Sequence, residues 1–98
     1  MTISDVKNGS ALTVKVEGRL DTTTAPELEA YLAKALPDVK DLVFDFEKLE
    51  YISSAGLRVL LATVKKMNRQ GSMVIRNANE MVKEVFDVTG FMEILNVE

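Results

Sequence analysis

Apolar and polar side chains alternate between residues 12 and 18. Side chains of a strand point to opposite faces with a period of two, so this alternation predicts a strand with one buried and one wet face. The turn sequence Asn8-Gly9-Ser10 comes just before it. This turn predicts a hairpin that joins the strand to a first short strand around Ile3–Val6.

Two later apolar runs predict core strands. Leu42–Phe46 is nearly continuous, which is typical of a strand that is covered on both faces or nearly so. Met73–Ile75 is a shorter run of the same kind. The apolar tail Phe91–Val97, as strand or helix, is expected to pack against the core, and the methionines are expected to fill that core: Met67, Met73, Met81 and Met92.

Apolar residues recur at helical spacing in three segments, residues 25–36, 57–67 and 81–86. Thr24 is expected to cap the first helix, with Glu27 reaching back to complete a capping box. Pro37-Asp38 ends that helix. Gly71 is expected to close the second helix, and Gly90 to follow the third as its C-terminal cap.

The order of these elements is strand, strand, helix, strand, helix, strand, helix. This alternation predicts an α/β fold with a mixed sheet of four to five strands, parallel neighbours joined by right-handed crossovers, and helices mainly on one face. A length of 98 residues fits one domain over residues 1–98.

Composition argues against an enzyme. The chain has neither His nor Cys, so the commonest general base, the commonest metal ligand and every thiolate chemistry are missing. We expect no cofactor and no metal. A carboxylate enzyme that uses Asp21 or Asp45 stays open as an alternative, although Asp45 is more simply explained as an exposed strand end.

Charge and hydropathy indicate no nucleic acid or membrane partner. The net charge is −3, and the basic residues that cluster are expected on the solvated outer face of the second helix: Arg58, Lys65, Lys66 and Arg69. No run approaches the roughly 18 apolar residues of a membrane span, and no signal-peptide pattern opens the chain. These features fit a cytoplasmic protein.

The segment Tyr51–Leu57 is the most informative stretch for function. A strand end leads through small residues directly into the longest predicted helix. The first amides of a helix have no partner within the helix, so this position attracts anions and suits a hydroxyl cap. From this pattern alone, Ser53 or Ser54 is most simply an N-cap with no further role.

Two motifs carry a family resemblance. Residues 52–61, Ile-Ser-Ser-Ala-Gly-Leu-Arg-Val-Leu-Leu, and Gly18-Arg19-Leu20-Asp21 upstream resemble the STAS family, and within it the bacterial anti-sigma factor antagonists. The order of elements agrees along essentially the whole chain, and residues 85–90 resemble the last-helix signature. The family motif commonly has Asp where Ser53 stands, followed by the serine that accepts phosphate, which matches Ser54.

The resemblance implies a switch between partners. The unphosphorylated antagonist binds an anti-sigma factor that is also a serine kinase, which frees the sigma factor. The kinase then phosphorylates Ser54, with Ser53 as the second candidate acceptor. The complex separates, and a serine/threonine phosphatase resets the protein. The resemblance also implies the residues of the partner-binding surface: Asp21, Thr22, Ser53, Ser54, Ala55, Gly56, Leu57 and Arg58. The alternative within the family is an interaction module of a transport or lipid-export complex whose serine is never phosphorylated, and for Asp21 the alternative is a turn former before the first helix.

Overall fold

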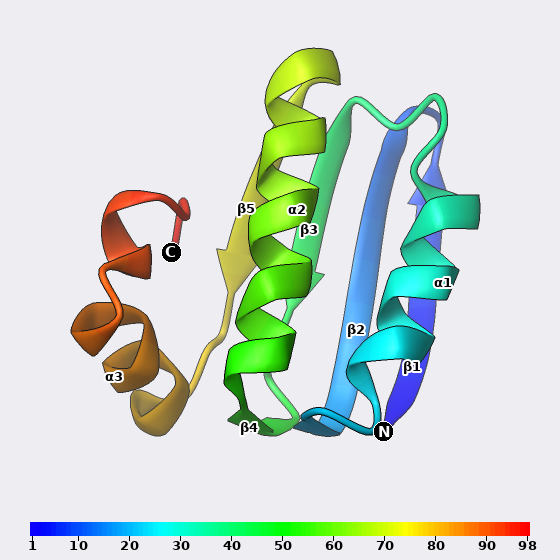
Figure 1. Ribbon diagram of the computed structural model, residues 1–98. Coiled ribbons are helices and arrows are strands. Elements are labelled where there is room, and N and C mark those ends of the chain that lie inside the picture. Colours follow the sequence, from blue (N-terminus) through cyan, green and yellow to red (C-terminus); the bar gives the residue numbers. More distant parts are fainter.

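A five-stranded mixed sheet forms the centre of the computed structural model, which describes residues 1–98 (Figure 1). The strands are β1 (Thr2–Asn8), β2 (Ala11–Leu20), β3 (Asp41–Asp45), β4 (Leu49–Ile52) and β5 (Ser72–Arg76). β1 and β2 form the antiparallel hairpin that the turn sequence predicts. β2 then pairs in parallel with β3, β3 with β5, and the far end of β2 with β4. The predicted α/β fold with a mixed sheet is confirmed.

Helices cover one face of this sheet. They are α1 (Ala25–Ala35), α2 (Ser54–Gln70) and α3 (Glu80–Val88), followed by a 3₁₀ turn at Phe91–Glu93. α1 and α2 lie side by side on the same face, whereas α3 lies beyond the β5 edge and packs against β4 (Figure 1). None of these helices combines the length and the apolar character that a membrane crossing requires.

The core lies between the helices and one face of the sheet. Along β3 and just after it, Leu42, Phe44 and Phe46 are fully buried. Val43 and Asp45 point to the other face and are only half-buried. The expectation that Leu42–Phe46 is covered on both faces is therefore wrong, because no helix lies over the second face.

The apolar pattern of the sequence does not predict β4 as a separate strand. Gly18 explains how the sheet accommodates it: its φ is +94°, and a β-bulge between Gly18 and Arg19 shifts the register of β2. A positive φ strains any residue with a Cβ, so glycine suits this position. β2 changes its partner just before the bulge: residues 11–15 pair with β3, and residues 18–20 pair with β4.

The C-terminal tail packs partly as expected. Leu95 is buried, and Val97 forms a parallel bridge with Ile75 that covers part of the β5 edge. Met67 is fully buried and Met73 half-buried. The other two methionines are exposed, so their assignment to the core is wrong: Met81 at 57% and Met92 at 41%. The core face of α3 consists of Val82 and Phe86 instead, and Met81 lies off that face.

Helix ends mostly follow their sequence signals. α1 ends at Ala35, just before Pro37, and Gly71 is the C-cap of α2. A Cβ on Gly71 would lie 1.7 Å from the Lys40 carbonyl oxygen, so this close approach requires glycine. Gly90 follows the C-cap of α3 with a φ of +79°, the left-handed conformation that glycine adopts readily.

Candidate functional site

The two sequence motifs meet at one end of the molecule. α1 and α2 both begin at the end of the sheet where β2 and β4 finish (Figure 1). The link is direct, because the Ser53 amide donates to the Leu20 carbonyl oxygen at 2.9 Å. The loop Asp21–Thr24 and the first turn of α2 therefore form one surface.

The two serines at this surface have different surroundings. Ser53 is half-buried, and it is the N-cap of α2: its hydroxyl oxygen accepts from the Gly56 amide at 3.5 Å. Ser54 is the first residue of the helix and is exposed, and its hydroxyl forms no hydrogen bond within the chain. The capping role predicted for one of the two serines thus belongs to Ser53, and the Ser54 hydroxyl stays exposed and unbonded.

The amides next to Ser54 are available to an anion. The first intrahelical bond runs from the Leu57 amide to the Ser53 carbonyl oxygen at 2.9 Å, and the Gly56 amide is used by the cap. The Ser54 and Ala55 amides precede these bonds and belong to the unpaired group at every helix start. The first turn of α2 has no acidic residue, so nothing on the helix opposes a negative charge there.

Gly56 and Leu57 support the site from beneath. Both are buried, Leu57 at 5% exposure, so neither is presented at the surface. A Cβ on Gly56 would lie 2.8 Å from carbon atoms of both Ile52 and Leu20. The helix start therefore packs tightly onto the ends of β2 and β4, and this packing sets the position of Ser54.

A groove between the first turns of α1 and α2 brings three of the predicted residues together. Its lining includes Thr22, Ala55 and Arg58, and the side from α1 adds Pro26 and Glu29. Arg58 is exposed and lies one helical turn after Ser54. Pro26 and Glu29 were not predicted as site residues, because only the packing of α1 against α2 places them there.

Asp21 holds the loop between β2 and α1. Its Oδ1 accepts from the Thr23 amide at 3.0 Å, the Thr23 hydroxyl at 2.8 Å and the Thr24 amide at 3.2 Å. The hydrogen bond from the Thr23 hydroxyl is the largest cause that lowers the pKa of the Asp21 carboxyl below its ordinary value. The turn-forming role predicted as one alternative for Asp21 is confirmed.

The predicted capping box of α1 is wrong. Thr24 is the N-cap residue, but its backbone is already helical and its side chain makes no cap hydrogen bond. Its hydroxyl oxygen instead accepts from the Asp21 amide at 2.8 Å, and the hydroxyl donates to the Arg19 carbonyl oxygen at 2.9 Å. The hydroxyl thus points back into the loop, and the Thr24 amide donates to Oδ1 of Asp21 at 3.2 Å and not to Glu27.

Arg19 connects this loop to the sheet. Its guanidinium lies 4.3 Å from the centre of the Tyr51 ring, a cation–π distance. Its Nε also lies 3.7 Å from Oδ2 of Asp21. Arg19 belongs to the upstream motif, but its role became apparent only with the pairing of β2 and β4.

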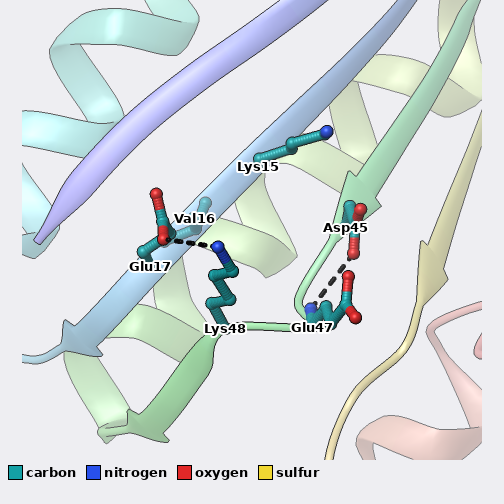
Figure 2. A pocket seen from close by; sticks show the side chains of 6 residues that line it. All are labelled: Lys15, Val16, Glu17, Asp45, Glu47 and Lys48. Atoms are coloured by element: carbon teal, nitrogen blue, oxygen red, sulfur yellow. Dashed lines mark hydrogen bonds and ion pairs between the residues drawn. The ribbon is translucent and has the colours of Figure 1, made fainter.

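A polar hollow on the uncovered face of the sheet is a separate feature (Figure 2). It is lined by Lys15, Val16, Glu17, Asp45, Glu47 and Lys48. Oδ1 of Asp45 accepts from the Glu47 amide at 3.1 Å and from the side-chain amide of Asn77 at 3.0 Å, and Lys48 pairs with Glu17 at 3.6 Å. The Asn77 bond is the largest cause that lowers the pKa of Asp45. Asp45 is thus a half-buried residue that fixes the chain after β3, on the face away from Ser54.

Together, the fold and the site define a small α/β domain with an exposed serine at the start of its longest helix. Residues 2–98 match the STAS domain family, and the chain belongs to that family.

Proteins similar to this chain are named as anti-sigma factor antagonists. BtrV of Bordetella bronchiseptica, named as a candidate anti-sigma factor antagonist, is 38% identical over 84 residues, covering 84% of this chain and 72% of BtrV. The anti-sigma-B factor antagonist of Staphylococcus aureus is 31% identical over 86 residues, covering 86% of this chain and 80% of that protein. The crystal structure of an anti-sigma factor antagonist from Mycobacterium paratuberculosis superposes with a TM-score of 0.89 at 25% identity, covering 98% and 83% of the two chains.

Proposed function

We propose that this protein is an anti-sigma factor antagonist that is switched by phosphorylation of Ser54. When unphosphorylated, it binds an anti-sigma factor with serine kinase activity and thereby releases a sigma factor. The kinase transfers a phosphoryl group to the Ser54 hydroxyl, the complex separates, and a serine/threonine phosphatase restores the binding form. The names of the relatives support the class of function. The exposed, unbonded Ser54 hydroxyl beside the groove is the observation that carries the choice of residue.

The division of roles between the two serines supports Ser54 over Ser53. A hydroxyl that caps a helix is held against the first turn, and phosphorylation of Ser53 would have to break that bond. The Ser54 hydroxyl has no such bond and is exposed to a kinase. Ser53 also replaces the Asp that the family motif commonly has, so one negative charge fewer lies beside the acceptor.

The electrostatics of the site explain how one phosphate changes binding and leaves the fold intact. A phosphoserine adds roughly −1.5 to −2 charge. At the first residue of α2 this charge meets the free amides and the positive end of the helix dipole, a favourable interaction of about 0.3–1 kcal/mol. In a partner interface, an unpaired buried charge costs about 2–5 kcal/mol, or about 30-fold to several thousand-fold in affinity. The phosphate is therefore expected to destabilise the complex and not the folded chain.

Asp21 and Thr22 form the second part of the proposed contact surface. Oδ1 of Asp21 is occupied within the loop, so Oδ2, beside Arg19, is the atom that a partner cation would meet. Thr22 is exposed on the rim of the groove. We expect the kinase to contact these residues together with Ala55 and Arg58 on α2.

The test is incubation with the cognate kinase and ATP, followed by intact-mass measurement. The wild type and Ser53→Ala should each gain one phosphate, and Ser54→Ala should gain none. Ser54→Ala should also stay folded and keep the kinase bound, whereas Ser54→Asp should weaken binding. If phosphate enters Ser54→Ala at the wild-type rate, Ser54 is not the acceptor.

The same experiment tests the alternative function within the family. An interaction module of a transport or lipid-export complex would take no phosphate at either serine. That module would use the groove as a contact surface without any phosphorylation.

A further inference from the structure

The surface of α3 and the turn after it is unlike the rest of the molecule. Four of the five large hydrophobic residues that are exposed lie in this short segment: Met81, Val88, Met92 and Ile94. On α3, Met81, half-buried Val85 and Val88 follow one another at spacings of four and three residues, which places them in one stripe along the helix. The adjoining side of α3, with Val82 and Phe86, packs into the core.

The same segment carries the net charge of the chain. Residues 80–94 contain four acidic side chains and one Lys, a net charge of −3, while the other residues carry 11 acidic and 11 basic side chains. The acidic residues are Glu80, Glu84, Asp87 and Glu93. The three ion pairs of the chain lie elsewhere, so these four carboxylates have no cationic partner within the molecule.

The apolar and acidic side chains are neighbours. Met92 lines a hollow together with Glu80, Lys83, Glu84 and Asp87, so the turn after α3 lies against the acidic side of the helix. The stripe of Met81, Val85 and Val88 runs along the adjoining side of α3 by its spacing. The surface is therefore apolar along one line and negative along the next.

We propose that this α3 surface, formed by Met81, Val85, Val88 and Met92 with Glu80, Glu84 and Asp87, is a docking site for a basic amphipathic helix of another protein. The apolar face of such a helix would cover the stripe, and Lys or Arg side chains along its edge would pair with the free carboxylates. Charge selects this occupant: a second copy would bring the same acidic surface and repel, and an anionic lipid surface would repel likewise. Exposed methionines suit such a surface, because their flexible side chains adapt to a partner.

This docking site is independent of the Ser54 switch. α3 is anchored to β4 by the Asn79 side chain, which donates to the Leu49 carbonyl oxygen at 3.0 Å, whereas the groove lies between α1 and α2. The proposal therefore survives or fails apart from the proposed function. Ser54→Ala serves as the variant that separates the two.

The probe is a synthetic peptide of about 18 residues, roughly five helical turns, with leucines at helical spacing and lysines elsewhere. Its control has the same composition in scrambled order. Calorimetric titration of the whole chain should show that the periodic peptide binds and the scrambled one binds at least about tenfold more weakly. Ser54→Ala should bind the periodic peptide as the wild type does, and the methyl signals of Met81 and Met92 should shift.

Matched variants locate the binding. Val88→Ser and Glu84→Lys should each raise the dissociation constant at least about tenfold. The control is Val6→Ser, because Val6 is the one exposed large hydrophobic residue outside the segment, at 59% exposure on β1. Val6→Ser should leave the dissociation constant within about twofold, and all variants should keep the wild-type unfolding midpoint. No binding of the periodic peptide, equal effects of Val88→Ser and Val6→Ser, or a dimer of the wild type that Val88→Ser dissociates would overturn the proposal.

Discussion

Replacing each of the two serines by alanine separates the cap of α2 from its proposed phosphate acceptor. Ser53→Ala removes the hydroxyl that accepts from the Gly56 amide, and loss of an N-cap costs about 0.5–2 kcal/mol. The oxygen–nitrogen distance of 3.5 Å is long for a hydrogen bond, so we expect the lower half of that range, about 0.5–1 kcal/mol. For a domain of this size, that loss corresponds to a fall of about 2–8 °C in the unfolding midpoint.

Ser54→Ala should have no such cost. The hydroxyl is exposed and unbonded, and alanine is a better helix former than serine. The unfolding midpoint should therefore stay unchanged or rise slightly.

Thermal unfolding followed by circular dichroism measures both effects. The N-cap of α3 provides a comparison for the size of the fall in the midpoint. The Asn79 side chain accepts from the Val82 amide at 2.8 Å and donates to the Leu49 carbonyl oxygen at 3.0 Å. Asn79→Ala loses two shorter bonds, so it should lower the midpoint more than Ser53→Ala. The reasoning is refuted if Ser54→Ala lowers the midpoint as much as Ser53→Ala does.

Three other predictions follow from single contacts. Asp21→Asn keeps the Oδ1 acceptor but loses the charge that the loop hydrogen bonds favour, so it should lower the unfolding midpoint slightly, less than Asp21→Ala does, and weaken kinase binding. Equal binding by Asp21→Asn and wild type in a titration would limit Asp21 to positioning the loop. Gly56→Ala adds an overpacking cost of about 1–3 kcal/mol, which the better helix propensity of alanine offsets by about 1 kcal/mol. Urea unfolding should therefore show a net loss of stability of up to about 2 kcal/mol. A gain in stability would contradict the close packing of the helix start. The lowered pKa of Asp45 stabilises the fold above the ordinary value of 3.8, and this contribution is lost as the pH falls through the lower folded pKa. Asp45→Asn should therefore lose less stability than wild type as the pH falls. If the free energies of unfolding of the two proteins fall in parallel on acidification, the carboxylate of Asp45 does not contribute to this pH dependence.

Element types were predictable because the apolar spacing differs between strand and helix. The alternation along β2 and the helical spacing along α2 each fit one period only, so these elements were predicted correctly. β4 was not predicted as a separate strand because it is four residues long and its pairing depends on the bulge after Gly18, which no local pattern records. The covering of Leu42–Phe46 was predicted wrongly because a run of apolar residues does not show whether a helix lies above each face.

Without the family resemblance, the candidate site was predictable only in its chemistry. Small residues before a long helix indicate a hydroxyl at a helix start, but the choice between Ser53 and Ser54 depends on where the first turn closes. The capping box failed for a similar reason: Thr24 has the right spacing, but the preceding loop determines the direction of its side chain. Contacts between elements, such as Arg19 with Tyr51, require the folded chain.

The most direct test of the proposed switch compares kinase binding by the unphosphorylated chain and the chain phosphorylated fully at Ser54. Both preparations should be titrated with the same kinase, and their unfolding midpoints recorded together. The charge at the start of α2 predicts a dissociation constant raised at least about 30-fold by phosphorylation, with an unfolding midpoint that is unchanged or higher. Equal dissociation constants, or a phosphorylated chain that is substantially less stable, would contradict the account.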